Sequence, residues 1–171
     1  MILSGQSIRK RCLHDALIFP FVERQKQNGM SYGLSISGYD VRIDQSISLT
    51  PNSFALASTL EKFTMPRDLL GIVHDKSTLA RRGVALQNTV IEAGWIGYLT
   101  LEITNHGPET VSLSRRDPIC QIIFHQLDEP AEQVYMGKYQ DQKRGPQAAR
   151  FEYNLSVFNW LGSCPCAKIG S

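Results

Sequence analysis

The sequence predicts an all-β protein, arranged as a sandwich or a distorted jelly-roll barrel. From Tyr39 onward, apolar and polar residues alternate with a period of two, which is typical of half-buried strands. Turn residues interrupt these runs at short intervals. The predicted strands do not alternate with helical segments, as strands do in α/β folds. After the first strand, we expect strands at Phe54–Ser58, Leu69–His74, Val84–Gln87, Gly97–Asn105, Val111–Leu113 and Ile119–Leu127.

One short helix is expected before the strands. Residues Leu3–Cys12 have helical spacing, with Ser4 as a candidate N-cap and with Ile8 and Cys12 one turn apart. The first strand follows later in the chain, where Tyr39, Val41 and Ile43 alternate with charged residues.

Length, charge and hydropathy limit the class of protein. The chain has 171 residues, which is the length of one domain. Its formal net charge is only +2, so we expect no nucleic-acid or membrane partner, and any anion site has to be local. No apolar run is long enough to cross a membrane, and the N-terminus lacks the order of a secretory signal, so we expect a cytoplasmic protein.

The end of the chain differs in composition from the rest. The apolar alternation stops after Pro130, and residues 136–150 are polar and basic, which suits an arm rather than a core element. We expect one domain over residues 1–150 that includes this arm, and a flexible tail of unknown role over residues 151–171. Cys164 and Cys166 lie in that tail, where a flexible end is a better explanation than a metal or redox site.

The stretch DKSTLARRG, residues 75–83, predicts a single helical turn between two strands. Asp75 or Ser77 can cap the turn, Leu79 can be buried, and Gly83 can adopt the left-handed conformation at its end.

The same turn is a candidate anion site. The free N–H groups at its start, the hydroxyls of Ser77 and Thr78 and the ammonium of Lys76 together suit a phosphate. Ser77 and Arg81 are four residues apart and therefore share a face. A solvated surface turn without a ligand explains this stretch equally well when it is taken alone.

The strand at residues 97–105 carries an unusual carboxylate. Leu99, Leu101 and Ile103 are predicted to face one side of the sheet, and Glu102 lies on the other side between two threonines. Glutamate is disfavoured in the middle of a strand. Either this face is open to water, which is the commoner case, or the carboxylate has a chemical role.

Five segments together resemble the dCTP deaminase and dUTPase superfamily. The resemblance implies a homotrimer of distorted jelly-roll subunits of the dUTPase-like β-clip type, with active sites between subunits and a deoxypyrimidine nucleoside triphosphate as substrate. Mg²⁺ would arrive bound to the triphosphate, without a protein cage. The segments are SGYDVRI (37–43), HDKSTLARRGV (74–84), NTVIEAGWIGYLTLEITN (88–105), PICQIIF (118–124) and KYQDQKRGPQAAR (138–150).

Within the superfamily, three residues favour the deaminase branch. Ser77 and Arg81 match the catalytic serine and arginine of that branch, and Glu102 matches its general base. The resemblance implies that the arm closes over the triphosphate. The substrate-binding residues expected from the resemblance are Lys76, Thr78, Asn88, Glu92, Trp95, Tyr135, Lys138, Tyr139 and Gln142.

Two departures from the family keep other functions open. The hairpin between Gly83 and Glu92 is as short as in dUTPases, with Asn88 where a small alanine is usual, and Glu92 replaces an aspartate. We expect deamination of dCTP or a modified dCTP, with or without cleavage of the dUTP product. The alternatives are a dUTPase and a non-catalytic nucleotide-sensing trimer.

Zinc-dependent deamination has a different signature. That chemistry needs His-x-Glu and Pro-Cys-x-x-Cys, and neither motif occurs in the chain. We therefore expect no zinc.

Overall fold

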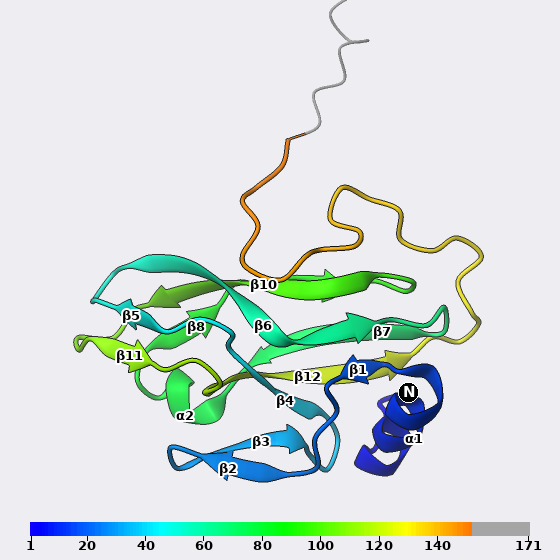
Figure 1. The fold of residues 1–171 in the computed structure, drawn as a ribbon, viewed down its shortest axis with the longest axis horizontal. Helices are drawn as coiled ribbons and strands as arrows, with labels where there is room; N and C mark the ends of the chain where they lie inside the picture. The colour runs from blue at the N-terminus through cyan, green and yellow to red at the C-terminus, as the bar shows by residue number, and fades with distance from the viewer. Residues whose placement is uncertain (152–171) are drawn as a thin grey trace, which may run out of the picture.

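The computed structural model describes residues 1–151, and most of its strands belong to two sheets that lie one above the other (Figure 1). The predicted all-β fold is confirmed, with open sheets in place of a closed barrel in the described residues. The four-stranded sheet has the order β1 (Ile18–Phe19), β6 (Phe54–Thr64), β10 (Ile96–Asn105) and β8 (Val84–Leu86). The six-stranded sheet has the order β2 (Gln25–Gln27), β3 (Met30–Leu34), β4 (Tyr39–Arg42), β12 (Pro118–Gln126), β7 (Leu69–Asp75) and β9 (Val90–Ile91). A small third sheet pairs β11 (Val111–Leu113) with β5 (Ile47–Leu49).

The core uses apolar side chains from both large sheets. Phe63 of β6, Leu101 of β10 and Phe124 of β12 are fully buried, and so is Tyr39 of β4. Burying such aromatic and branched side chains is the main force that holds the two sheets together.

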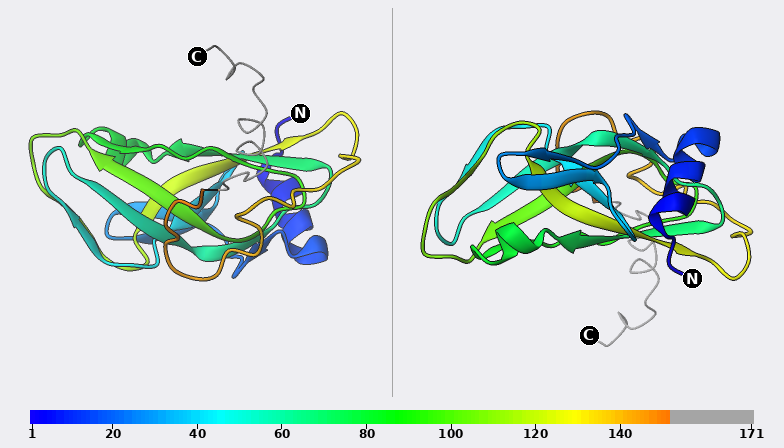
Figure 2. Two further views of the ribbon diagram at one scale, coloured as in Figure 1. Left: turned by 90° about the horizontal axis from the view of Figure 1, so that it is seen from above. Right: turned by 90° about the horizontal axis from the view of Figure 1, so that it is seen from below.

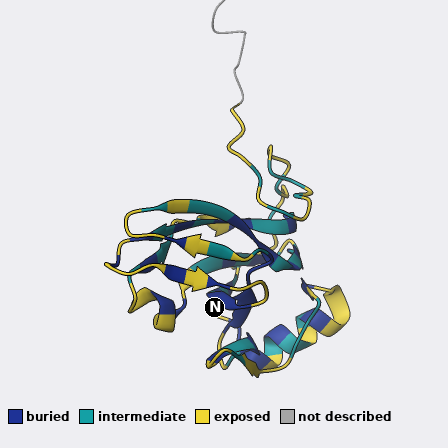
Figure 3. Ribbon diagram, turned by 60° about the vertical axis from the view of Figure 1, so that its left-hand side comes forward, coloured by how far each residue is buried: buried dark blue, intermediate teal, exposed yellow. Residues whose placement is uncertain are grey.

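Both helices form where the sequence predicts them. Helix α1 spans Gly5–Asp15 with Ser4 at its N-cap position but without a side-chain capping bond, and it buries Ile8 and Cys12 while its opposite face stays exposed (Figure 3). Helix α2 spans Ser77–Ala80 and buries Leu79, but Lys76 occupies its N-cap position in place of the predicted Asp75 or Ser77. The following Gly83 adopts φ +87°, the left-handed conformation that glycine tolerates best.

Strand β4 shows why alternation does not always separate core from solvent. Its charged residues are almost as buried as its apolar ones, because they form ion pairs inside the protein. Asp40 Oδ1 lies 3.2 Å from Lys76 Nζ, and Arg42 Nε lies 2.7 Å from Glu61 Oε1.

Four strands carry no clear signal in the sequence. Strands β1 and β9 have two residues each, which is too short for a period, and β2 is the polar tripeptide Gln25–Gln27. Strand β3 contains Gly33, whose φ is +83°. A Cβ at Gly33 would lie 2.7 Å from Val22 O, so glycine is needed where the preceding loop approaches β3.

The arm, residues 136–150, contains no named strand and docks on the four-stranded sheet (Figures 1 and 2). Tyr98 N donates to Gln142 O at 3.0 Å, and a Cβ at Gly97 would lie 2.7 Å from Gln142 N. Gly97 is therefore needed for this close approach. The tail from residue 152, with Cys164 and Cys166, lies outside the described residues.

Within residues 1–151, no helix has both the length and the apolar composition of a membrane span.

Candidate active site

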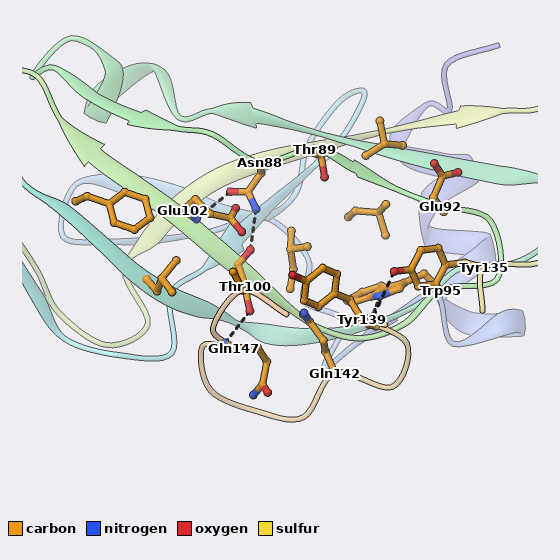
Figure 4. A pocket seen from close by; sticks show the side chains of 16 residues that line it. Asn88, Thr89, Glu92, Trp95, Thr100, Glu102, Tyr135, Tyr139, Gln142 and Gln147 are labelled. Atoms are coloured by element: carbon orange, nitrogen blue, oxygen red, sulfur yellow. Dashed lines mark hydrogen bonds between the residues drawn. The ribbon is translucent and has the colours of Figure 1, made fainter. Parts of the chain in front are cut away.

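A cavity of about 680 Å³ opens on the outer face of the four-stranded sheet, and we call it the Glu102 pocket (Figure 4). Strands β6 and β10 form its floor, the segment of residues 88–92 and Trp95 form its sides, and the arm covers part of it. The lining residues are Phe54, Leu56, Asn88, Thr89, Val90, Ile91, Glu92, Trp95, Leu99, Thr100, Glu102, Tyr135, Tyr139, Gln142, Gln147 and Ala149.

Glu102 lies on the pocket side of β10 because the strand alternates. Leu101 and Ile103 turn into the core and are fully buried, so Glu102 faces outward. The residue directly opposite on β6 is Leu56, an apolar neighbour on the same face. Half-burial raises the pKa of Glu102 above the ordinary glutamate value, and the nearby Asn88 amide lowers it in part. A raised pKa suits a group that must both accept and donate a proton near neutral pH.

Leu99 packs against the core, as predicted for it together with Leu101 and Ile103, but it also lines the pocket. The register between β10 and β6 shifts between Tyr98 and Thr100, which marks a β-bulge. The extra residues are on β6, where residues 59–61 stand opposite Leu99 alone, and at this irregularity Leu99 lines the cavity beside Thr100. Sequence alternation alone does not reveal a bulge.

Asn88 holds its segment against β10. Strand β8 ends at Leu86, and beyond it Asn88 Nδ2 donates to Thr100 O at 2.7 Å while Asn88 Oδ1 accepts from Glu102 N at 3.4 Å. The side-chain amide thus takes the place of a backbone partner for Thr100 O and Glu102 N of β10. It was expected as a substrate contact, and the structure shows this positioning contact in addition.

Aromatic residues form the wall near Glu92. Trp95 is buried, and its Nε1 donates to Tyr139 O at 2.7 Å. Tyr135 N donates to Ala93 O at 2.9 Å, and Tyr135 Oη accepts from Tyr139 N at 3.3 Å. These bonds tie the start of the arm to residues 93–95, which lead into β10 (Figure 4).

The arm also contributes polar groups. Gln147 N donates to Thr100 Oγ1 at 3.0 Å, two residues from Glu102 along β10. Gln142 Oε1 is buried, and no hydrogen-bond partner for it is found within residues 1–151. A ligand with a donor group could satisfy this atom.

Seven of the residues expected from the sequence meet in this pocket, and five do not. Glu102, Asn88, Glu92, Trp95, Tyr135, Tyr139 and Gln142 line it. The residues that do not line it are Ser77, Arg81, Thr78, Lys76 and Lys138.

The residues of α2 lie on a separate part of the surface, at the opposite end of β8 from Asn88 (Figure 1). Ser77, Thr78 and Arg81 are exposed, and Arg81 Nη1 donates to Ser77 O at 3.0 Å. Lys76 is buried, and its ammonium pairs with Asp40 at 3.2 Å, so we leave it out of the proposed substrate contacts.

Lys138 is exposed at the start of the arm, and its ammonium lies 5.3 Å from the centre of the Tyr139 ring.

Several lining residues were not foreseen. Thr89, Thr100 and Gln147 add polar groups, and Phe54 and Leu56 add the apolar end of the pocket. Thr100 and Leu56 could have been found from the sequence, because they share the face of Glu102 once β6 and β10 are paired. Gln147 had no comparable signal, because the arm follows no period.

Within the described residues, no group of three or more His, Cys, Asp or Glu side chains is placed to hold a metal ion.

Comparison with known proteins agrees with the resemblance seen in the sequence. The family model described as "dCTP deaminase-like" matches residues 36–127. The dCTP deaminase of Novosphingobium aromaticivorans is 37% identical over 83% of this chain and 95% of its own length. The dCTP deaminase of Acidobacterium capsulatum is 38% identical over 83% of this chain and 95% of its own length.

Solved structures support the fold. The dUTPase of EIAV is similar with a TM-score of 0.52 and 19% identity, covering 69% of this chain and 94% of that structure. The dUTPase of the Staphylococcus aureus phage phi11, whose structure describes a structural Mg(II) ion, has a TM-score of 0.52 at 15% identity, covering 70% of this chain and 92% of that structure.

Proposed function

This chain belongs to the dCTP deaminase-like family, and on that premise we propose that it is an enzyme that hydrolyses dCTP to dUTP and ammonia. The observation that carries the proposal is the placement of Glu102 in a half-buried pocket, with its pKa raised by burial. A carboxylate on an open sheet face would be solvated and would keep the ordinary pKa of glutamate.

The reaction replaces the 4-amino group of cytosine by oxygen. Water attacks C4 while the Glu102 carboxylate takes a proton from that water, and the carboxyl group then gives the proton to N3. Glu102 then takes the proton of the new C4 hydroxyl and gives it to the amino group, which leaves as ammonia as the C4 carbonyl forms. Glu102 performs these transfers without a metal-bound water, and Mg²⁺ enters as part of the substrate through the phosphate oxygens.

The arm excludes bulk water from this chemistry and holds the nucleotide. Gln142 offers a buried carbonyl oxygen without a partner in the described chain, and Tyr139 and Trp95 offer apolar surface to the sugar or base. Glu92 lies on the side of the pocket lined by residues 88–92. It is a further contact to the nucleotide in this proposal.

Ser77 and Arg81 enter this proposal through a neighbouring protomer. In one chain they lie outside the Glu102 pocket, and their exposed side chains are free to meet the pocket of a second copy in a homotrimer. Ser77 then holds the water and Arg81 orients the Glu102 carboxylate.

A shared site can be tested by complementation. Ser77→Ala and Glu102→Gln chains are each expected to be inactive alone, and the whole population of trimers that assembles at random from the two co-expressed chains should recover about a quarter of the wild-type activity. The recovery arises because some interfaces pair an intact Ser77 with an intact Glu102. Absence of recovery in verified mixed trimers would place both residues in one chain's site.

Product analysis tests the function itself. Purified protein with Mg²⁺ and dCTP should yield ammonia and dUTP in equal amounts, as measured by chromatography and an ammonia assay. Incubation with dUTP alone shows whether the product is cleaved further to dUMP and pyrophosphate. Unchanged dCTP would refute the deaminase assignment.

Asn88 should tune the pH dependence of the reaction. The Asn88 amide lowers the pKa of Glu102, so Asn88→Ala should raise that pKa further. Because Glu102 must be ionised to take a proton from water, the acidic limb of the kcat/KM profile should move to higher pH in the variant. A limb that stays in place or moves to lower pH would contradict this role of Asn88.

A dUTPase remains the second candidate because of Glu92. This carboxylate lines the same pocket and could position a water at the phosphates instead of at the base. That function predicts pyrophosphate from dUTP and no turnover of dCTP.

A further inference from the structure

We propose that Asp44 is a positioning residue that holds the arm over the Glu102 pocket through an ion pair with Arg144. The inference rests on the proposed function for its kinetic consequence, and it has a structural consequence that does not depend on that function. Neither residue lines the pocket, so each acts through the arm rather than on the substrate.

The contact between Asp44 and Arg144 has the geometry of a strong pair. Arg144 Nε lies 2.6 Å from Asp44 Oδ2, and Arg144 Nη2 lies 2.7 Å from Asp44 Oδ1, so both oxygens are engaged at once. Two parallel charge-assisted bonds fix direction as well as distance. The Asp44 side chain is only 8% exposed, whereas that of Arg144 is 51% exposed.

Asp44 is itself firmly held by the sandwich. Its backbone N donates to Ser58 O on β6 at 2.9 Å, and its Oδ1 also accepts from Arg115 Nε at 3.0 Å. The two arginines lower the pKa of the Asp44 carboxyl group, with Arg144 as the larger cause. Asp44 is therefore a charged, pre-oriented anchor on the body of the protein.

Arg144 lies in the part of the arm that covers the pocket, so its ion pair with Asp44 holds that part in place. Gln142, two residues before it, and Gln147, three residues after it, both line the pocket. Within residues 1–151, the Asp44–Arg144 pair is the only ion pair that joins the arm to the sandwich. The other contacts of the arm with the body of the protein are uncharged: the Gln140 amide bonds to Ile96 N and Gly94 O, Gln142 forms a parallel bridge with Gly97, and Gln147 N donates to Thr100 Oγ1.

Loss of this pair should lower the fraction of free enzyme whose arm is in place. The apparent affinity for the nucleotide then falls in proportion to the fraction of enzyme whose arm is in place. Once the nucleotide is bound, it holds the arm closed, so the rate of the chemical step is unchanged. Asp44→Asn and Arg144→Gln are each expected to raise KM for dCTP about 3- to 10-fold, with kcat within about twofold of wild type. The double variant should raise KM no more than the larger single effect, because both changes break one contact.

Arg115→Gln is the matched control. It removes the other cation from Asp44 but makes no contact with the arm, so KM should stay at the wild-type value. If Arg115→Gln raises KM as much as Arg144→Gln does, Asp44 acts through the body of the protein and the proposal is wrong.

Limited trypsin digestion without nucleotide tests the arm directly. Cleavage after Lys138 and Lys143, followed by mass spectrometry, should be faster in Asp44→Asn than in wild type or Arg115→Gln, at equal denaturation midpoints. Unchanged cleavage together with unchanged KM would overturn the inference. A wild-type protein that leaves dCTP intact would refute the proposed function alone, because the cleavage comparison would still decide the role of Asp44.

Discussion

Glu102→Gln should reduce the rate of ammonia release from dCTP by about 10²- to 10⁴-fold, the usual contribution of a positioned general acid–base group. Glutamine has nearly the same shape, so the backbone bond from residue 102 to Asn88 and the packing against Leu56 should persist. The variant loses only the ability to take up and release a proton. Equilibrium binding of dCTP should therefore stay close to that of the wild type while kcat falls.

Glu92→Gln is the informative comparison for this experiment. Glu92 lines the same pocket from its other side, so both variants remove one negative charge from it. If Glu102 is the base, its replacement should lower kcat far more than replacement of Glu92 does. The opposite order would favour water activation at the phosphates, and wild-type ammonia release by Glu102→Gln would end the assignment.

Glu61→Ala should lower the free energy of unfolding by about 3–5 kcal/mol, the usual cost of removing one partner from a buried ion pair. The Glu61 side chain has no exposed surface, and its two oxygens accept from Arg42 Nε at 2.7 Å and from Arg42 N at 3.0 Å. The variant leaves the Arg42 charge buried without a carboxylate partner in the described residues, and the Tyr32 ring lies 4.8 Å from its guanidinium carbon. Denaturant unfolding at fixed protein concentration measures the loss.

Two further variants separate the ion pair from general packing. Glu23→Ala removes the partner of Arg9 in an exposed pair and should change stability little. Glu61→Leu combined with Arg42→Met should recover part of the loss, because apolar groups need no charge partner. Equal losses in Glu61→Ala and Glu23→Ala would show that burial of the pair has no energetic consequence.

The fold could be predicted from the sequence wherever one face of a strand is apolar. Strands β10 and β12 begin and end within one residue of the expected positions, because Leu101, Ile103 and their counterparts alternate cleanly. Strand β6 runs on to Thr64, beyond the expected Ser58, and carries the buried Glu61 in its extension. A charged residue at that point looks like the end of a strand unless its partner Arg42 is known.

Local patterns pointed to Glu102 alone among the residues of the candidate site, and the six other expected residues that line the pocket were expected only from the family resemblance. Glu102 stands out in the sequence because a carboxylate is unusual in mid-strand, and the structure places it in the pocket. The bulge at Leu99 and the docking of Gln147 depend on contacts between segments far apart in the chain, so no local pattern encodes them. Asp44 and Arg144, 100 residues apart, are a further case of such a contact.

The most direct test of the account is the structure of the Glu102→Gln protein with dCTP and Mg²⁺ bound. We expect the cytosine ring in the Glu102 pocket, with C4 facing residue 102, the arm closed over the phosphates, and Ser77 and Arg81 supplied by a neighbouring protomer. A nucleotide whose base lies outside this pocket, or whose C4 faces away from residue 102 in every protomer, would contradict the account.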